Sequence, residues 1–207
     1  MVETKVWRAM MSVAALTALA CDDVTAPKFA VDNSTRRLTT GEAVACALDS
    51  AGATYCWGLN GIWWEYGAPV SSIIGSGRPA VAPIPKLASF ATGVGPHFCG
   101  ITTDKAAVCW GRGTYGQLGG GVDGNVGNPP ATVMGNIRWA DLSVGRLTTC
   151  GRSDTGVGYC WGYNQSGEVG VASVPLLTRS TSPVPVDGGF AFKSIIAAWL
   201  HACGITT

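Results

Sequence analysis

The sequence has little charge and no long helical pattern, and both absences narrow the classes of protein it can belong to. Lysine, arginine, aspartate and glutamate make up only 13% of the 207 residues, and the formal net charge is +1. Such a chain has no basic stripe to neutralise a phosphate backbone, so nucleic acid is not an expected partner. No long stretch carries apolar residues at the i, i+3, i+4, i+7 spacing of an amphipathic helix.

Turn-forming residues are abundant instead. The chain contains 29 glycines and 11 prolines, and they separate short runs of valine, isoleucine, threonine, tyrosine and tryptophan. This arrangement is typical of many short strands joined by turns. We therefore predict an all-β fold.

The first twenty residues differ from the rest and predict an export signal. Lys5 and Arg8 precede twelve mostly apolar residues at 9–20, which are too few to span a bilayer as a helix but suit a secretory signal. Ala18-Leu19-Ala20 fits the rule for ordinary signal cleavage. The stretch also resembles a bacterial lipoprotein signal, in which Cys21 becomes the lipidated N-terminus, although the usual leucine is displaced by one position. We favour lipidation, because an unpaired cysteine at the cut otherwise has no role in an oxidising compartment.

Three stretches of the chain share one pattern. Residues 46–58 read CALDSAGATYCWG, residues 99–111 read CGITTDKAAVCWG, and residues 150–162 read CGRSDTGVGYCWG. A fourth copy begins with CGITT at Cys203, and the first cysteines of the four copies lie 53, 51 and 53 residues apart. A period of this length predicts a propeller or solenoid, whose units bury their faces against their neighbours.

Each complete copy predicts a β-hairpin closed by a disulfide. If the residues midway between the two cysteines form the turn, the cysteines face each other with Cβ atoms about 4.5–5.5 Å apart, within reach of a bond. Such a bond stabilises a hairpin that is marginal on its own by about 3 kcal/mol. The predicted pairs are Cys46–Cys56, Cys99–Cys109 and Cys150–Cys160.

The residue just after each midpoint indicates the type of turn. Gly52 and Gly156 suit the left-handed position of a three-residue loop with a bulge. Lys105 occupies this position in the second copy, so we expect a longer or looser turn there.

Zinc is the competing use of paired cysteines, and the spacing argues against it. Nine residues separate the two cysteines of each pair, whereas structural zinc ligands are usually two to four residues apart, and the chain has only two histidines. The partner of Cys203 is expected near position 213, after the last residue of the sequence. We therefore expect the chain to be a fragment that ends within a fourth repeat.

Each complete copy is followed by a segment in which glycines recur at short intervals. This segment reads CWGRGTYGQLG at 109–119 and CWGYNQSGEVG at 160–170. With their lead-ins, these copies resemble the repeat of the regulator of chromosome condensation family. That resemblance implies blades of a seven-bladed β-propeller, in the double-cysteine form of exported bacterial members. It divides the chain into a signal at 1–20, a linker or outer strand at 21–37, and a partial propeller of ~52-residue repeats at 38–207.

Aromatic residues of the repeats have two expected roles. Trp57, Trp110 and Trp161 follow a cysteine at the same place in each copy, so we expect each to pack between neighbouring sheets. The lengthened loop at residues 60–67 reads NGIWWEYG and departs from the repeat. Its aromatic residues are candidates for partner binding, and the alternative is that a tryptophan covers a blade seam. The candidates are Trp63, Trp64 and Tyr66.

No group of residues predicts catalysis or cofactor binding. GRGTYG at 111–116 matches a dinucleotide motif, but no helix can follow it, and the repeat explains its glycines. His97 and His201 both stand two residues before a first cysteine, which favours a structural hydrogen bond. The acidic residues are scattered singly. We expect no catalytic, cofactor-binding or metal-binding residues, and no cofactor.

The expected function is that of an exported, non-enzymatic β-propeller scaffold that presents loops for protein–protein interaction at the cell envelope. One alternative is an inhibitor of an extracellular enzyme, since a member of the resembled family blocks β-lactamases. Another is a hydrolase or lyase acting on cell-wall glycan. The expected partner is an unknown protein or cell-envelope ligand, and the membrane is contacted only through an N-terminal lipid anchor. The expected location is periplasmic or at the cell surface, or else secreted.

Overall fold

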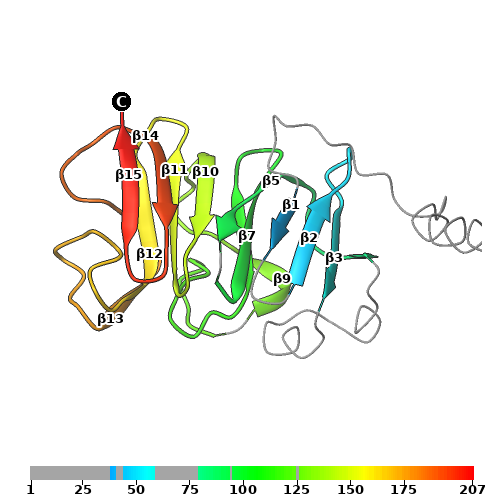
Figure 1. The fold of residues 1–207 in the computed structure, drawn as a ribbon, viewed down its shortest axis with the longest axis horizontal. Helices are drawn as coiled ribbons and strands as arrows, with labels where there is room; N and C mark the ends of the chain where they lie inside the picture. Colours follow the sequence, from blue (N-terminus) through cyan, green and yellow to red (C-terminus); the bar gives the residue numbers. More distant parts are fainter. Residues whose placement is uncertain (1–37, 41–43, 59–78, 94, 125) are drawn as a thin grey trace, which may run out of the picture.

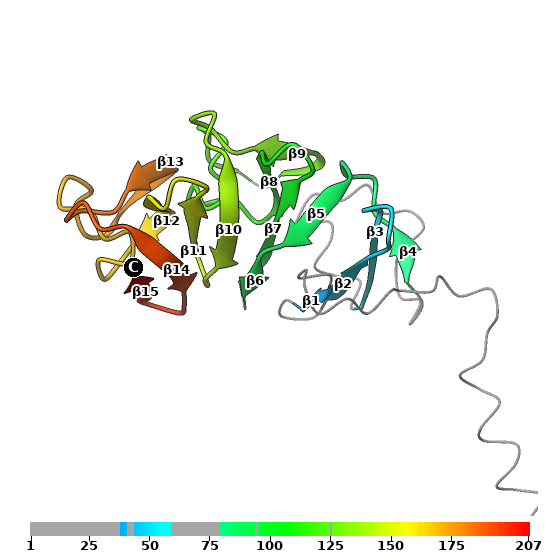
Figure 2. The same ribbon diagram turned by 90° about the horizontal axis from the view of Figure 1, so that it is seen from above.

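The computed structural model describes residues 38–40, 44–58, 79–93, 95–124 and 126–207, and within these ranges the regular structure is all strand. The strands of each blade form an antiparallel sheet in which neighbours follow the sequence order. The all-β prediction is therefore confirmed. Figure 2 shows the sheets fanned side by side in sequence order, which is the arrangement of propeller blades.

Each blade begins with a strand that precedes the cysteine hairpin. The first blade contains β1 (Leu38–Thr40), β2 (Val44–Leu48), β3 (Thr54–Gly58) and β4 (Ala80–Val81). The second contains β5 (Leu87–Phe90), β7 (His97–Thr102), β8 (Ala107–Gly111) and β9 (Val126–Thr132). The third contains β10 (Trp139–Val144), β11 (Thr148–Ser153), β12 (Gly158–Asn164) and β13 (Thr178–Pro185), and the fourth contains β14 (Phe192–Ala197) and β15 (Ala202–Thr206). The short strand β6 (Thr92–Gly93) pairs in parallel with β10 and so joins the second blade to the third.

The strand order gives the molecule two distinct faces (Figure 1). We call one the turn face: it carries the cysteine-hairpin turns and the segments that lead into the next blade. We call the other the loop face: it carries the turns between the first and second strands of the third and fourth blades and the loops that follow β8 and β12. In Figure 1 the turn face is uppermost and the loop face is below.

Each blade is attached to the hairpin turn of the blade before it. The first residue of β5, β10 and β14 donates its backbone N–H to the carbonyl of the residue just after the hairpin midpoint. The bonds are Leu87 N to Gly52 O at 3.0 Å, Trp139 N to Lys105 O at 2.9 Å and Phe192 N to Gly156 O at 2.8 Å. This repeated bond fixes the start of one blade relative to the turn of its neighbour.

The turn at Lys105 does not differ from the others, so the predicted longer or looser turn is wrong. Lys105 has a φ of 70°, close to the 80° of Gly52. Its N–H donates to Thr102 O at 3.0 Å, and the Thr102 N–H donates to Ala106 O at 2.9 Å, as the equivalent groups do in the first hairpin. The hairpin register and the bond to Trp139 hold a lysine in a conformation that glycine adopts at less steric cost.

The three predicted cysteine pairs are bonded in the structure. In each hairpin the two cysteines are register partners, and their Cα atoms lie 4.1 Å apart. This short separation is typical of the non-hydrogen-bonded positions of an antiparallel ladder. The disulfides are Cys46–Cys56, Cys99–Cys109 and Cys150–Cys160. Cys203 in β15 is an exposed free thiol.

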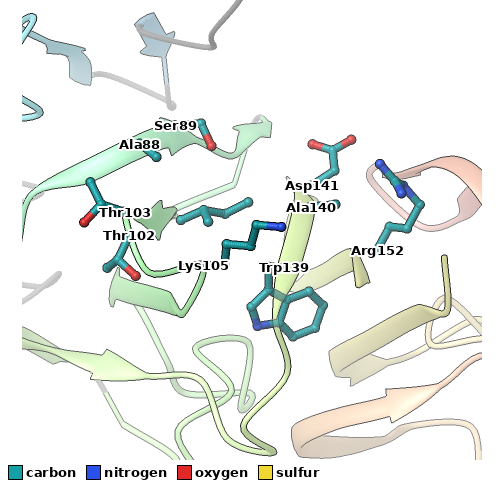
Figure 3. Close-up of a pocket in the computed structure, with 10 residues that line it drawn as sticks. Ala88, Ser89, Thr102, Thr103, Lys105, Trp139, Ala140, Asp141 and Arg152 are labelled. Carbon is teal, nitrogen blue, oxygen red and sulfur yellow. The ribbon is translucent and has the colours of Figure 1, made fainter. Parts of the chain in front are cut away.

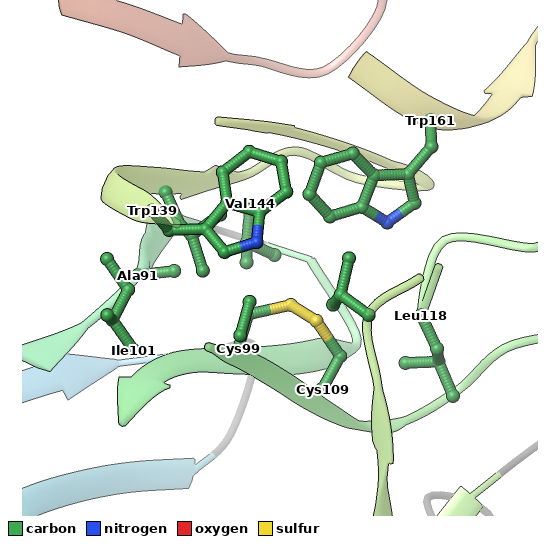
Figure 4. Close-up of a cluster of buried hydrophobic side chains, with 11 residues drawn as sticks. Ala91, Cys99, Ile101, Cys109, Leu118, Trp139, Val144 and Trp161 are labelled. Carbon is green, nitrogen blue, oxygen red and sulfur yellow. A yellow bond between two sulfur atoms is a disulfide. The ribbon is translucent and has the colours of Figure 1, made fainter. Parts of the chain in front are cut away.

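The alternation of side chains along a strand explains why tryptophan follows cysteine. Successive residues point to opposite faces of a sheet, so a cysteine that faces the next blade is followed by a tryptophan that faces the previous one. Figure 4 shows the result: Trp161 and Trp139 of the third blade lie over the Cys99–Cys109 disulfide of the second. At this point the seam between these blades is a buried contact of sulfur and indole.

The three repeated tryptophans are not equally buried. Trp110 is packed in the first seam with Cys46 and Cys56, and its side chain is 1% exposed. Trp161 in the second seam is 0% exposed. Trp57 of the first blade is only half-buried. The prediction that each tryptophan packs between two sheets is therefore confirmed for Trp110 and Trp161. Each of these two faces a preceding blade among the described residues, whereas Trp57 belongs to the first described blade.

A glycine after the first cysteine makes room in each later seam. A Cβ atom built on Gly100, Gly151 or Gly204 would lie 2.4–2.6 Å from a bulky side chain of the same blade. These side chains belong to the first residue of the blade's first strand, and they fill the seam with the preceding blade. They are Leu87, Trp139 and Phe192.

Candidate binding cleft between the second and third blades

An open cleft of about 600 Å³ lies at the turn-face end of the seam between the second and third blades (Figure 3). Its walls come from the start of β5, the β7–β8 hairpin, the start of β10 and the end of β11. Trp139 lies beneath it, and polar side chains surround the opening. The lining residues are Ala88, Ser89, Ile101, Thr102, Thr103, Lys105, Trp139, Ala140, Asp141 and Arg152.

A small ion network joins the two blades beside the cleft. Lys105 Nζ lies 3.3 Å from Asp154 Oδ2, and Arg138 Nε lies 3.1 Å from the same oxygen. Arg138 also donates to the carbonyl of Asp104 at 3.5 Å. These pairs connect one hairpin turn to the next, and because the side chains are partly solvated they contribute more to orientation than to stability.

Two carboxyl groups near the cleft stay charged well below neutral pH. The hydrogen bond that Thr102 Oγ1 donates holds the pKa of Asp104 below its ordinary value. Desolvation acts to raise the pKa of Asp154, but the hydrogen bonds and positive charges of Lys105 and Arg138 outweigh it and lower that pKa. Neither carboxyl group is therefore poised to exchange a proton near neutrality.

Arg152 brings a charged group with an unsatisfied polar atom to the cleft. Its Nε is buried and has no hydrogen-bond partner. It lies opposite Asp141 in the β10–β11 register, so a charge of each sign stands at the cleft wall. These groups provide donors and acceptors for binding a polar ligand or a protein side chain.

His97 is buried and makes a structural hydrogen bond, as predicted. Its Nε2 lies 2.7 Å from Thr149 Oγ1 in the third blade, and that hydroxyl donates to the carbonyl of Gln117 at 2.8 Å. Trp161 Nε1 donates to the same carbonyl at 2.9 Å. Burial lowers the pKa of His97 to about 3, so the neutral ring joins the two blades through a hydrogen bond. His201, by contrast, is exposed on the loop face.

The predicted binding and processing residues cannot be placed. Trp63, Trp64, Tyr66 and Cys21 lie outside the described residues. Within the described ranges, no group of three His, Cys, Asp or Glu side chains could hold a metal ion. None of these ranges contains a helix that is long and apolar enough to cross a membrane.

The cleft itself was missed at the sequence level. Lys105 and Asp154, which pair beside the cleft, are 49 positions apart in the sequence. Single charges that far apart form no local pattern. One signal was present: Lys105 and Asp154 both stand in hairpin turns of consecutive repeats. Blades that pack side by side bring consecutive turns together, so these opposite charges could have been paired from the repeat alignment.

A family model matches the second cysteine hairpin. Residues 97–117 match the regulator of chromosome condensation (RCC1) repeat. This segment runs from β7 through the hairpin into the loop that follows β8, and it contains His97, the Cys99–Cys109 disulfide and Trp110.

Three solved structures, two of them of yeast RCC1 (Prp20), resemble this fold. Yeast RCC1 (Prp20), in a structure with Kap60 bound, is 20% identical, with a TM-score of 0.70 over 87% of this chain and 43% of that one. Human WBSCR16 is 16% identical, with a TM-score of 0.67 over 82% of this chain and 44% of that one. Prp20p from Saccharomyces cerevisiae is 18% identical, with a TM-score of 0.65 over 82% and 43%. The chain spans less than half the length of each of these structures.

The fold and its seams define an all-β protein built of propeller blades, each complete hairpin closed by a disulfide. Within that class the second repeat is of the RCC1 type, since residues 97–117 match that family model, and the fold resembles that of yeast RCC1. The predicted resemblance to the RCC1 repeat is therefore confirmed, and the exported bacterial, double-cysteine form stays a prediction.

Proposed function

We propose that this protein is an exported, non-enzymatic β-propeller scaffold that presents its loops for protein–protein interaction at the cell envelope. The observation that carries the proposal is the clamped seam, in which a buried disulfide of one blade packs against a tryptophan of the next. Such seams make a stiff frame, and a stiff frame lowers the entropy lost when surface loops bind a partner. The loops and turns on both faces remain available for contact.

The disulfides support a location outside the cytoplasm. Disulfides persist in oxidising compartments and are rare where thiols are kept reduced. Three of them lie within the described residues, and residues 1–20 have the composition of an export signal. We propose Cys21 as the site of lipid attachment, which would hold the propeller at the membrane surface.

The structural relatives support a protein partner by analogy. The yeast RCC1 structure contains Kap60, and the Prp20p structure is described together with binding to Gsp1p and histones. Those partners belong to the relatives. For this chain we propose only that a propeller face meets a protein, with the loop at residues 60–67 as one candidate contact through Trp63, Trp64 and Tyr66.

Chemical crosslinking in the cells that produce the protein tests this function. The tagged full chain should be recovered with a specific envelope protein, and a Cys21→Ala variant should move from the membrane pellet to the soluble fraction. Purified chain should not degrade cell-wall glycan. Turnover of that glycan, or recovery of the tagged chain in the cytoplasm without a crosslinked protein, would contradict the proposal.

A further inference from the structure

The loop face carries two pairs in which an arginine lies against an aromatic ring. The guanidinium carbon of Arg146 lies 4.6 Å from the centre of the Trp199 ring, and that of Arg112 lies 6.0 Å from the centre of the Tyr115 ring. Trp199 is 58% exposed, which is unusual for so large an apolar side chain. Both arginines are exposed as well. Each ring therefore orients an arginine at the surface.

These pairs belong to one continuous surface that crosses three blades. The rings of Tyr115 and Tyr163 lie 4.7 Å apart and join the loop of the second blade to the end of β12. The Tyr163 N–H donates to the carbonyl of Leu147 at 2.9 Å, next to Arg146. The Arg146 N–H donates to the carbonyl of Ala198 at 3.2 Å, next to Trp199. We call this surface the Arg–aromatic patch: Arg112, Tyr115, Arg146, Tyr163 and Trp199.

Among the described residues, no carboxylate balances the positive charge of the patch. The described part of the loop face also contains Asp123, which pairs with Arg179 at 2.5 Å. It contains Glu168 too, which accepts the Ser166 N–H at 2.6 Å and is only 5% exposed. No ion pair to Arg112 or Arg146 exists within the described residues.

The cleft on the turn face differs in this respect. There, Lys105 and Arg138 share the carboxylate of Asp154, so these two cations are already paired within the protein. Arg112 donates its Nε to Thr114 Oγ1 at 3.1 Å, which leaves its terminal nitrogens for a ligand. The loop face is thus better prepared than the cleft to bind an anionic group.

We propose that the Arg–aromatic patch is the docking surface for a protein segment that carries carboxylates beside aromatic or apolar side chains. This inference rests on the proposed scaffold function and specifies its partner. A guanidinium binds a carboxylate through two parallel hydrogen bonds, and a stacked arginine is already held in place for it. Arginine, tyrosine and tryptophan are also the side chains that dominate the energetics of protein interfaces. Two unpaired arginines are too few to hold a nucleic-acid backbone.

The test is a selection of random 12-residue displayed peptides on the immobilised full chain. Enriched peptides should contain aspartate or glutamate next to an aromatic or apolar residue. In fluorescence polarisation, the best peptide should bind Arg146→Ala and Trp199→Ala at least about tenfold more weakly than the unchanged protein. Arg146→Lys should bind with intermediate affinity, because lysine keeps the charge but lacks the planar fork. Arg138→Ala on the turn face is the matched control and should bind normally.

Enriched peptides without acidic residues, or equal affinity for all variants, would overturn the inference, and so would binding of polygalacturonate but of no peptide. These outcomes are separable from failure of the proposed function. If crosslinking still recovers an envelope protein, and recovery depends on Arg138 but not on Arg146, the scaffold function stands and the patch is wrong. If no protein is recovered, the scaffold function itself fails. The variants should keep the melting temperature of the unchanged protein, because the substituted side chains are exposed.

Discussion

Lys105 holds a left-handed backbone conformation that its counterparts Gly52 and Gly156 adopt without a Cβ clash. Replacement by glycine should relieve this strain, whereas replacement by alanine should keep it. Both variants lose the ion pair with Asp154, so their difference isolates the backbone term. We expect Lys105→Gly to be more stable than Lys105→Ala by about 1 kcal/mol in urea unfolding. Equal stability of the two variants would mean that the turn carries no such strain.

His97 should make the stability of the protein depend on pH in the acidic range. Its pKa is about 3 in the folded protein and about 6.5 in an unfolded chain. Above the unfolded value the ring is neutral in both states and has no effect on the pH dependence. As the pH falls below 6.5, the unfolded chain binds a proton that the folded protein does not, so stability falls until the folded pKa is reached.

The measurement is the free energy of unfolding at several pH values between 6.5 and 3. His97 should contribute a slope of about 1.4 kcal/mol per pH unit over most of this window. A His97→Gln variant should lose that contribution while keeping those of Asp104 and Asp154. An unchanged slope in His97→Gln would show that the buried histidine does not govern acid unfolding.

At the scale of the strand, the sequence predicted which residues pair across a hairpin, but it did not predict how deeply each residue is buried. The equal spacing of the cysteines defined three hairpins, because a hairpin register relates residues by symmetry about its turn. The same reasoning could not give the burial of Trp57 or the conformation of Lys105. Burial is decided by the neighbouring blade, and the turn at Lys105 is held by a bond from Trp139, which is 34 residues away. Neither partner is visible in a local pattern.

The seams should make equivalent tryptophans unequal in their effect on stability. Trp161 is 0% exposed and covers the Cys99–Cys109 disulfide, so Trp161→Ala should cost about 3–5 kcal/mol of unfolding free energy. Trp57 occupies the same repeat position but is half-buried. Trp57→Ala should cost at most about half as much. Equal losses in denaturant unfolding would contradict the view that the preceding blade sets the contribution of each tryptophan.

At the scale of the whole molecule, the segments of closely spaced glycines were enough to predict stacked blades, because a repeat with a fixed motif must place its copies in equivalent positions. The functional surfaces were not predictable in this way. The cleft collects residues from four separate elements, and the Arg–aromatic patch uses residues that differ from one blade to the next. The repeated residues form the stacked blades, and the residues that differ between repeats give each face its polar and aromatic side chains. Arg146 and Trp199 illustrate this, since they occupy equivalent turns and yet differ completely as side chains.

The stacked blades should also protect their sulfur atoms from reagents in a definite order. The six disulfide cysteines are 0–1% exposed. The disulfides should resist dithiothreitol until a seam opens, because the reagent must reach the sulfur to attack it.

The cover over each disulfide sets the order of reduction. Cys150–Cys160 packs against the aliphatic side chain of Ile195, while Cys99–Cys109 lies beneath two tryptophans. Peptide mapping after timed exposure to dithiothreitol should find the former reduced first. Trp161→Ala should selectively hasten reduction of Cys99–Cys109, since it removes the cover from that seam alone. Reduction of all pairs at one rate, in the variant as in the unchanged protein, would mean that the blades open together and that the seams are not independent units.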